Sequence, residues 1–125
     1  MLQKFVYWTG AFDFIVGLAV YAGAMSNPQP AQFVPLMTLG TFLLMAAACL
    51  MWASQDMVQR YPIIFWQGLV RITAVCAVVY AVPNGLSESW ELSVAAFDGV
   101  VGLTYVVGSI RVSGLSLLQC LRCQA

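Results

Sequence analysis

Four apolar stretches set the strongest limit on how this chain folds. They run over about residues 5–24, 33–53, 63–82 and 92–110. Each is close to the ~20 residues that an α-helix needs to cross a bilayer's hydrocarbon core of roughly 30 Å. They lack the polar and apolar alternation, over spans of roughly ten residues, that marks transmembrane β-strands. We therefore predict an all-α fold with four transmembrane helices, in a single membrane domain over residues 1–125.

The links between the stretches are short and rich in proline, glycine and polar residues, such as SNPQPAQ and PNGLSESW. Loops this short make sequential helices antiparallel neighbours. The sequence therefore predicts an antiparallel up-down four-helix bundle. After it, the tail of residues 111–125 places Leu115, Leu118 and Arg122 at helical spacing. This tail is expected to be either a short interfacial helix or a frayed end.

The composition agrees with an integral membrane protein. Charged residues make up 8% of the chain and hydrophobic residues 62%, whereas a soluble domain carries about 25% charged residues. The net charge is zero, which argues against a nucleic-acid partner because phosphate binding needs a clustered basic surface. The chain has no histidine, the commonest metal ligand and general base. No catalytic constellation stands out, so we expect no enzyme, no metal and no cofactor.

Basic residues beside the stretches predict the orientation. Lys4 precedes the first stretch, Arg60 lies in the second link, and Arg111 and Arg122 follow the fourth stretch. Because cytoplasmic loops carry an excess of lysine and arginine, both termini and the second link are expected in the cytoplasm. We expect the membrane to be the inner (plasma) membrane of a bacterium.

Three ionisable residues lie inside the apolar stretches: Asp13, Arg71 and Asp98. Each costs roughly 2.5–3.5 kcal/mol at a helix centre. At 1.5 Å per residue, their depths agree within about 6 Å, which an arginine side chain can span. Gln67 lies one helical turn before Arg71 on the same face. We therefore predict an intramembrane polar cluster of Asp13, Gln67, Arg71 and Asp98.

Two readings of this cluster stay open. It has a formal charge of −1, so it could hold a proton or a cation in a small transporter. It could instead be a buried ion pair that fixes the order and rotation of the helices. Trp66 and Tyr105 are candidates to line it.

The sequence around Asp13 is nearly repeated around Asp98. AFDFIVGL begins at Ala11 and AFDGVVGL begins at Ala96. In both copies the aspartate precedes a glycine by four residues, which places Asp13 with Gly17, and Asp98 with Gly102, on one helix face. A glycine lets a neighbouring backbone approach closely. We predict that the same close-packed polar contact is built twice, in helices that run in opposite directions as in inverted repeats.

The tail contains a C-x-x-C pair, Cys120 and Cys123. Such a pair is typical of thiol redox chemistry or of half a metal site. No second pair and no histidine complete a zinc site. The pair is therefore a candidate thiol pair at the membrane surface, and a redox protein is a third reading of the chain.

Three motifs are arranged as in a known family: the glycine-bearing first stretch (GAFDFIVGL), the arginine of QGLVRI in the third stretch and the glycines of FDGVVGL in the fourth. This arrangement resembles that of DoxX-like four-helix membrane proteins. The resemblance covers residues 5–110. It implies a membrane subunit or partner of redox enzymes. The leading hypothesis is a non-enzymatic accessory or structural subunit whose partners are membrane lipids and other membrane-protein subunits or a second copy. The alternative is a small proton- or ion-coupled transporter using the polar cluster.

Overall fold

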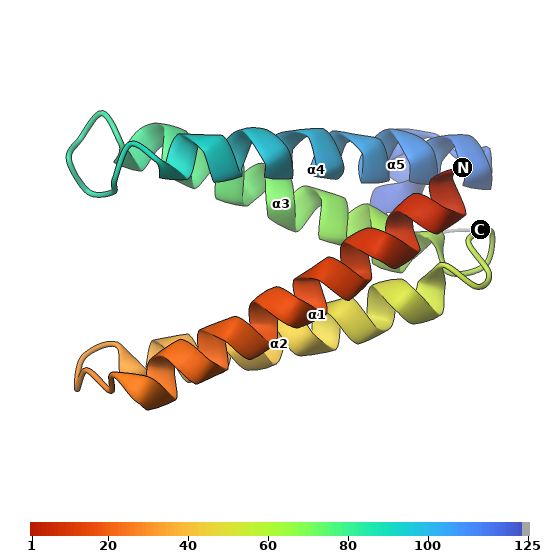
Figure 1. Ribbon diagram of the computed structural model, residues 1–125. Helices are drawn as coiled ribbons and strands as arrows, with labels where there is room; N and C mark the ends of the chain where they lie inside the picture. Colours follow the sequence, from red (N-terminus) through yellow and green to blue (C-terminus); the bar gives the residue numbers. More distant parts are fainter. Residues whose placement is uncertain (124–125) are drawn as a thin grey trace. The chain divides into compact units, whose positions relative to one another are not determined.

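The computed structural model describes residues 1–123, and every regular element within them is a helix. Figure 1 shows α1 (Leu2–Ser26), α2 (Phe33–Ala53), α3 (Tyr61–Ala81), α4 (Glu91–Ser113) and the short α5 (Leu117–Leu121). The first four are long and apolar enough to cross a membrane. The predicted fold class, all-α with four transmembrane helices, is confirmed. The chain is accordingly a small integral membrane protein.

The chain divides into two compact units, the first ending at Asp56 and the second beginning at Met57. Each unit is built around an antiparallel helical hairpin, formed by α1 with α2 and by α3 with α4 (Figure 1). Short links explain this pairing, since a helix joined to the next by a few residues must fold back beside it. The prediction of a single membrane domain stays a prediction.

In the first unit, small residues bring α1 and α2 together. A Cβ atom placed on Gly10 would lie 3.2 Å from Leu50 Cβ and 3.3 Å from the Ala47 carbonyl oxygen. Near the other end of the hairpin, the hydroxyls of Tyr21 on α1 and Thr41 on α2 form a hydrogen bond. Without a hydrophobic driving force between helices in lipid, contacts of these two kinds hold a membrane hairpin together.

In the second unit, α4 continues to Ser113, beyond the predicted end at residue 110. It stops at Gly114, whose φ of +69° is the left-handed conformation that glycine adopts without strain. The chain then turns and forms α5. A capping box between Ser116 and Gln119 closes the first turn of that helix, with each side chain bonded to the other residue's backbone N–H.

The short helix α5 folds back beside α3 (Figure 1). Its Cys120 is fully buried and belongs to a small core with Tyr61 and Phe65 of α3 and Val106 of α4. Leu117, Leu118 and Leu121 are exposed. The tail is therefore anchored to the second unit by one side of α5 and presents apolar side chains on the other.

Candidate functional site

The second unit contains an ion pair between its two long helices. Nη1 of Arg71 on α3 donates a hydrogen bond to Oδ1 of Asp98 on α4. The two side chains are 13% and 24% exposed, respectively, so the pair is largely withdrawn from the surface. The Arg71 guanidinium carbon also lies 5.8 Å from the centre of the Tyr105 ring, a cation–π distance. Arg71 is therefore held by two side chains of the neighbouring helix.

The spacing along α4 explains how one arginine reaches both groups. Asp98, Gly102 and Tyr105 are separated by four and then three residues, so they lie on one face of the helix. A Cβ atom on Gly102 would lie 3.2 Å from Arg71 Cβ. Because glycine has no side chain there, the arginine stem passes close to the α4 backbone. The carboxylate lies one turn to one side of this point and the ring one turn to the other.

The backbones of α3 and α4 meet beside the ion pair at Gly68 and Gly102. A Cβ on Gly68 would lie 2.9 Å from the Gly102 carbonyl oxygen, and a Cβ on Gly102 would lie 3.0 Å from the Gly68 carbonyl oxygen. Both distances are below ordinary contact, so neither position accepts a side chain without separating the helices. Gly68 was not among the predicted site residues. A signal was present, since a glycine within a helix costs up to about 1 kcal/mol and needs a packing reason.

The two remaining members of the predicted polar cluster, Asp13 and Gln67, lie on different helices. Asp13 is buried on α1 of the first unit. Gln67 is half-buried on α3, one turn before Arg71. The assembly of these two residues with Arg71 and Asp98 into one cluster stays a prediction.

The glycines of the repeated sequence lie at the centre of each hairpin. Gly17 of α1 is close to Leu44 of α2, where an added Cβ would meet the leucine side chain at 3.0 Å. Its carbonyl oxygen lies 3.4 Å from the position of a Cβ on Gly40 of α2. Gly102 of α4 meets Gly68 of α3 in the second unit, as described above. In each unit the glycine of the repeat therefore faces a glycine of the neighbouring helix.

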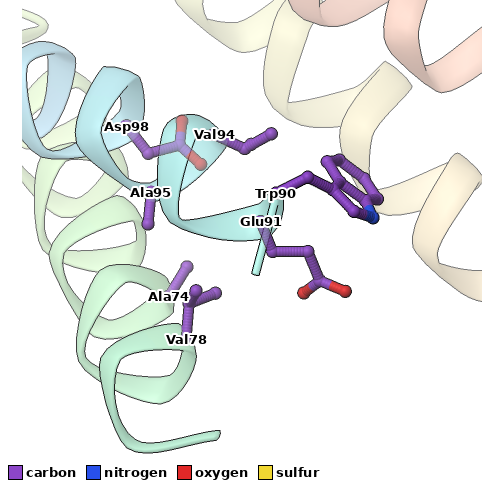
Figure 2. Close-up of a pocket in the computed structure, with 7 residues that line it drawn as sticks. All are labelled: Ala74, Val78, Trp90, Glu91, Val94, Ala95 and Asp98. Carbon is purple, nitrogen blue, oxygen red and sulfur yellow. The ribbon is translucent and has the colours of Figure 1, made fainter. Parts of the chain in front are cut away.

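Asp98 also lines a pocket of about 170 Å³ between α3 and α4. The other lining residues are Ala74, Val78, Trp90, Glu91, Val94 and Ala95. Figure 2 shows Ala74 and Val78 of α3 opposite Ala95 of α4, with Trp90 and Glu91 where α4 begins. The pocket thus has mostly apolar walls, and the carboxylate of Glu91 points away from Asp98 (Figure 2). Glu91 was not among the predicted site residues.

The two tail cysteines have different surroundings. Cys120 is fully buried, and its Sγ lies 3.7 Å from the Ser113 hydroxyl. Cys123 is exposed, and its Sγ accepts a hydrogen bond of 3.4 Å from Nε1 of Trp66. Both are free thiols. Trp66, a candidate to line the polar cluster, is thus engaged with the tail.

Metal-ligating side chains do not gather within the described part of the chain: no group of three or more aspartate, glutamate or cysteine residues there could hold an ion. No protein-family model, curated protein or solved structure matches the chain. The resemblance to DoxX-like proteins stays a prediction.

Proposed function

We propose that this protein is a non-enzymatic accessory or structural subunit of a membrane complex. The observation that carries the proposal is the arrangement around Arg71. Its charge is compensated by Asp98 and covered by Tyr105, all within one hairpin and directly beside a glycine contact. A buried ion pair of this kind can specify how two helices align. An arginine used in this way keeps a small hairpin in one register.

The outer faces of the helices support a role in assembly. Large apolar side chains are exposed on all four long helices: Trp8, Phe12, Ile15 and Leu18 on α1, Val34, Leu39, Phe42 and Met45 on α2, Val70, Val79 and Tyr80 on α3, and Phe97, Val100, Leu103 and Val107 on α4. In a membrane these faces contact lipid tails or other helices. We propose that other membrane-protein subunits, or a second copy of the chain, cover part of them.

The proposal extends to the full polar cluster and to the setting of the protein. Asp13 and Gln67 join the Arg71–Asp98 pair in it, which fixes the order of the helices. The plan shared with DoxX-like proteins supports a bacterial plasma membrane as the location. The distribution of lysine and arginine supports a cytoplasmic position of both termini.

Extraction of the native complex tests the accessory role. A tagged copy is expressed at its natural level, extracted in mild detergent and analysed by native sizing and mass spectrometry. We expect stoichiometric co-purification with one or more larger membrane proteins. A lone monomer or homodimer, recovered under conditions that keep other membrane complexes intact, would contradict the accessory role.

A second candidate function is a small proton- or ion-coupled transporter, and the pocket that reaches Asp98 favours it. The two functions differ in their response to Asp98→Asn. If the ion pair is structural, this substitution lowers the stability of the purified protein. If Asp98 carries a transported ion, the substitution abolishes flux into proteoliposomes and leaves the fold stable. Measuring both quantities on the same preparation separates the two functions.

A further inference from the structure

We propose that Cys120 and Cys123 form a reversible redox site. A hydroperoxide oxidises the exposed thiol of Cys123, and the buried thiol of Cys120 then closes an intramolecular disulfide. The proposal rests on the turn that joins the two residues, on their unequal burial and on the packing of α5 against α3. It is independent of both functions above, because an accessory subunit and a transporter could each carry such a site.

The backbone between the two cysteines brings them within reach of each other. The N–H of Cys123 donates a 3.1 Å hydrogen bond to the carbonyl oxygen of Cys120, which closes a turn of four residues. The Cα atoms at the ends of such a turn lie within about 7 Å of each other. A disulfide joins Cα atoms that are roughly 4.4–6.8 Å apart. The backbone separation of this pair therefore permits a disulfide.

Cys123 has a backbone conformation that is unusual for a residue with a side chain. Its φ of +50° lies in the left-handed region, and no other non-glycine residue among residues 1–123 has a positive φ. Cys123 follows Arg122, the C-cap of α5, at the position where helices commonly end on glycine. Residues held in such conformations cluster at functional sites. Local propensity favours glycine here, so the cysteine calls for another explanation.

The two thiols differ in access, which assigns each of them a step. Cys123 is exposed, and its Sγ lies 3.4 Å from Nε1 of Trp66. Cys120 is fully buried in the small core that it forms with Tyr61 and Phe65. Phe65 and Trp66 are consecutive residues of α3, so both cysteines pack against one short stretch of that helix. A water-soluble hydroperoxide therefore reaches Cys123 first, and Cys120 is the resolving thiol.

The reaction balances in two steps. The Cys123 thiol attacks one oxygen of the peroxide, the O–O bond breaks, and an alcohol or water leaves with the thiol proton, which produces a sulfenic acid. The Cys120 thiol then attacks the sulfenic sulfur, so that an S–S bond forms, the S–O bond breaks and water leaves. One peroxide thus takes the two electrons of one disulfide. Glutathione reverses the reaction by attacking the exposed Cys123 sulfur, which releases the Cys120 thiol, and a second glutathione then releases Cys123.

The cytoplasmic position proposed for both termini agrees with a reversible bond. Thiols in the cytoplasm are kept reduced, and the disulfides that form there are usually transient and serve catalysis or redox sensing. The alternative use of a C-x-x-C pair is a metal site, which needs further ligands. Within residues 1–123, no group of three or more metal-ligating side chains includes the pair. Redox chemistry is therefore the use of this pair that the described residues support.

Cys120 also has an ordinary role, and the experiment must separate the two. A buried cysteine packs as a small apolar side chain. If packing were its only role, a peroxide would oxidise Cys123 alone and take it to the sulfinic acid, while Cys120 stayed reduced. A covalent link between the two residues is therefore the deciding readout.

The test is treatment of the purified full-length chain in lipid nanodiscs with excess hydrogen peroxide. The remaining thiols are then blocked with iodoacetamide in SDS, and the chain is digested with trypsin without reductant. Trypsin cleaves after Arg122 and separates residues 112–122 from 123–125 unless a disulfide joins them. We expect the joined peptide, about 2 Da lighter than the sum of its two parts, and its loss after incubation with glutathione. Cys49 and Cys76 are internal controls and should be recovered as blocked thiols.

Two variants test the order of the steps. In Cys120→Ser, the sulfenic acid of Cys123 has no thiol to meet, so dimedone should trap at least about tenfold more of it than in the natural sequence. In Cys123→Ser, Cys120 should stay reduced until the protein is unfolded. Three results would each overturn the proposal: no joined peptide from the natural sequence, a disulfide between the Cys123 residues of two copies in its place, or oxidation of Cys120 in folded Cys123→Ser at an undiminished rate.

Discussion

The contact between Gly68 and Gly102 can be tested by adding a single methyl group to either residue. An alanine Cβ at position 68 would lie 2.9 Å from the Gly102 carbonyl oxygen and 2.9 Å from Val106 Cγ2. An alanine Cβ at position 102 would lie 3.0 Å from the Gly68 carbonyl oxygen. A carbonyl oxygen belongs to the backbone and cannot rotate away. The two helices must therefore move apart by about 0.5 Å to reach ordinary contact distance.

The expected cost follows from the overpacking of well-packed interiors, which is typically about 1–3 kcal/mol. Replacing a helical glycine by alanine also brings a gain of up to about 1 kcal/mol in helix propensity. The net effect of Gly68→Ala or Gly102→Ala is then a destabilisation of up to about 2 kcal/mol. Separating the helices also weakens the Arg71–Asp98 pair beside them, which adds to the loss.

A matched control lies on the same helix. Gly99 is three residues before Gly102, and the nearest atom to a Cβ there is Val75 Cγ2 at an ordinary 3.8 Å. Gly99→Ala therefore keeps the propensity gain without the clash, and should stabilise the protein by about 0.5–1 kcal/mol. The first unit offers the same contrast between Gly17→Ala, which clashes with α2, and Gly23→Ala, which has no neighbour within 4 Å.

The assay is equilibrium unfolding of the full-length protein by SDS in mixed micelles, followed by far-ultraviolet circular dichroism. The three α3/α4 variants are compared at the same total detergent concentration. We expect Gly99→Ala to be more stable than the natural sequence, and Gly68→Ala and Gly102→Ala to be less stable. The reasoning is refuted if Gly102→Ala proves as stable as Gly99→Ala, since the close backbone contact would then have no energetic weight.

Two further predictions concern the ion pair and one concerns the tail. Asp98→Asn should lower the free energy of unfolding by about 3 kcal/mol, the lower end for a buried pair, because it removes the negative charge that Arg71 contacts on α4. The double variant Arg71→Met with Asp98→Leu should recover most of that loss in the same SDS titration, since two apolar side chains remove the charge from the interior. In the tail, the exposed Cys123 should react with a water-soluble maleimide in the folded protein, and the buried Cys120 should react only after unfolding. Mass spectrometry of the labelled peptides measures both reactions. Equal labelling of the two cysteines in the folded protein would contradict the packing of α5.

The helices themselves could be predicted because length and apolar content decide which segments cross a membrane. The observed α2 has the predicted bounds of residues 33–53, and the other three long helices begin or end within a few residues of the expected positions. The end of α4 was placed too early because Arg111 marks the expected interface, whereas the helix continues until Gly114 allows the backbone to turn.

The details of the site depend on register, which the sequence does not determine. Arg71 and Asp98 stand out because charge is rare in apolar helices, and the structure joins them. Gly68 does not stand out, since the chain contains ten glycines and only the alignment of α3 with α4 shows which of them meets a backbone. The pocket was missed for a related reason. Glu91 lies between the predicted link and the predicted apolar stretch, and only the observed start of α4 places it on the same helix face as Asp98.

The second hairpin gives a physical reason for an aspartate four residues before a glycine, as in Asp98 and Gly102. At Gly102 the backbone of α4 lies close to that of α3, and the position of a Cβ there is 3.2 Å from Arg71 Cβ. A carboxylate one turn away lies within reach of the arginine only because the glycine brings the helices together. The ion pair in turn opposes sliding of one helix along the other, since a shift of one residue would leave a charge uncompensated in an apolar environment. Close packing and charge compensation therefore depend on each other, which predicts that Gly102→Ala and Asp98→Asn together destabilise the protein by less than the sum of their separate effects.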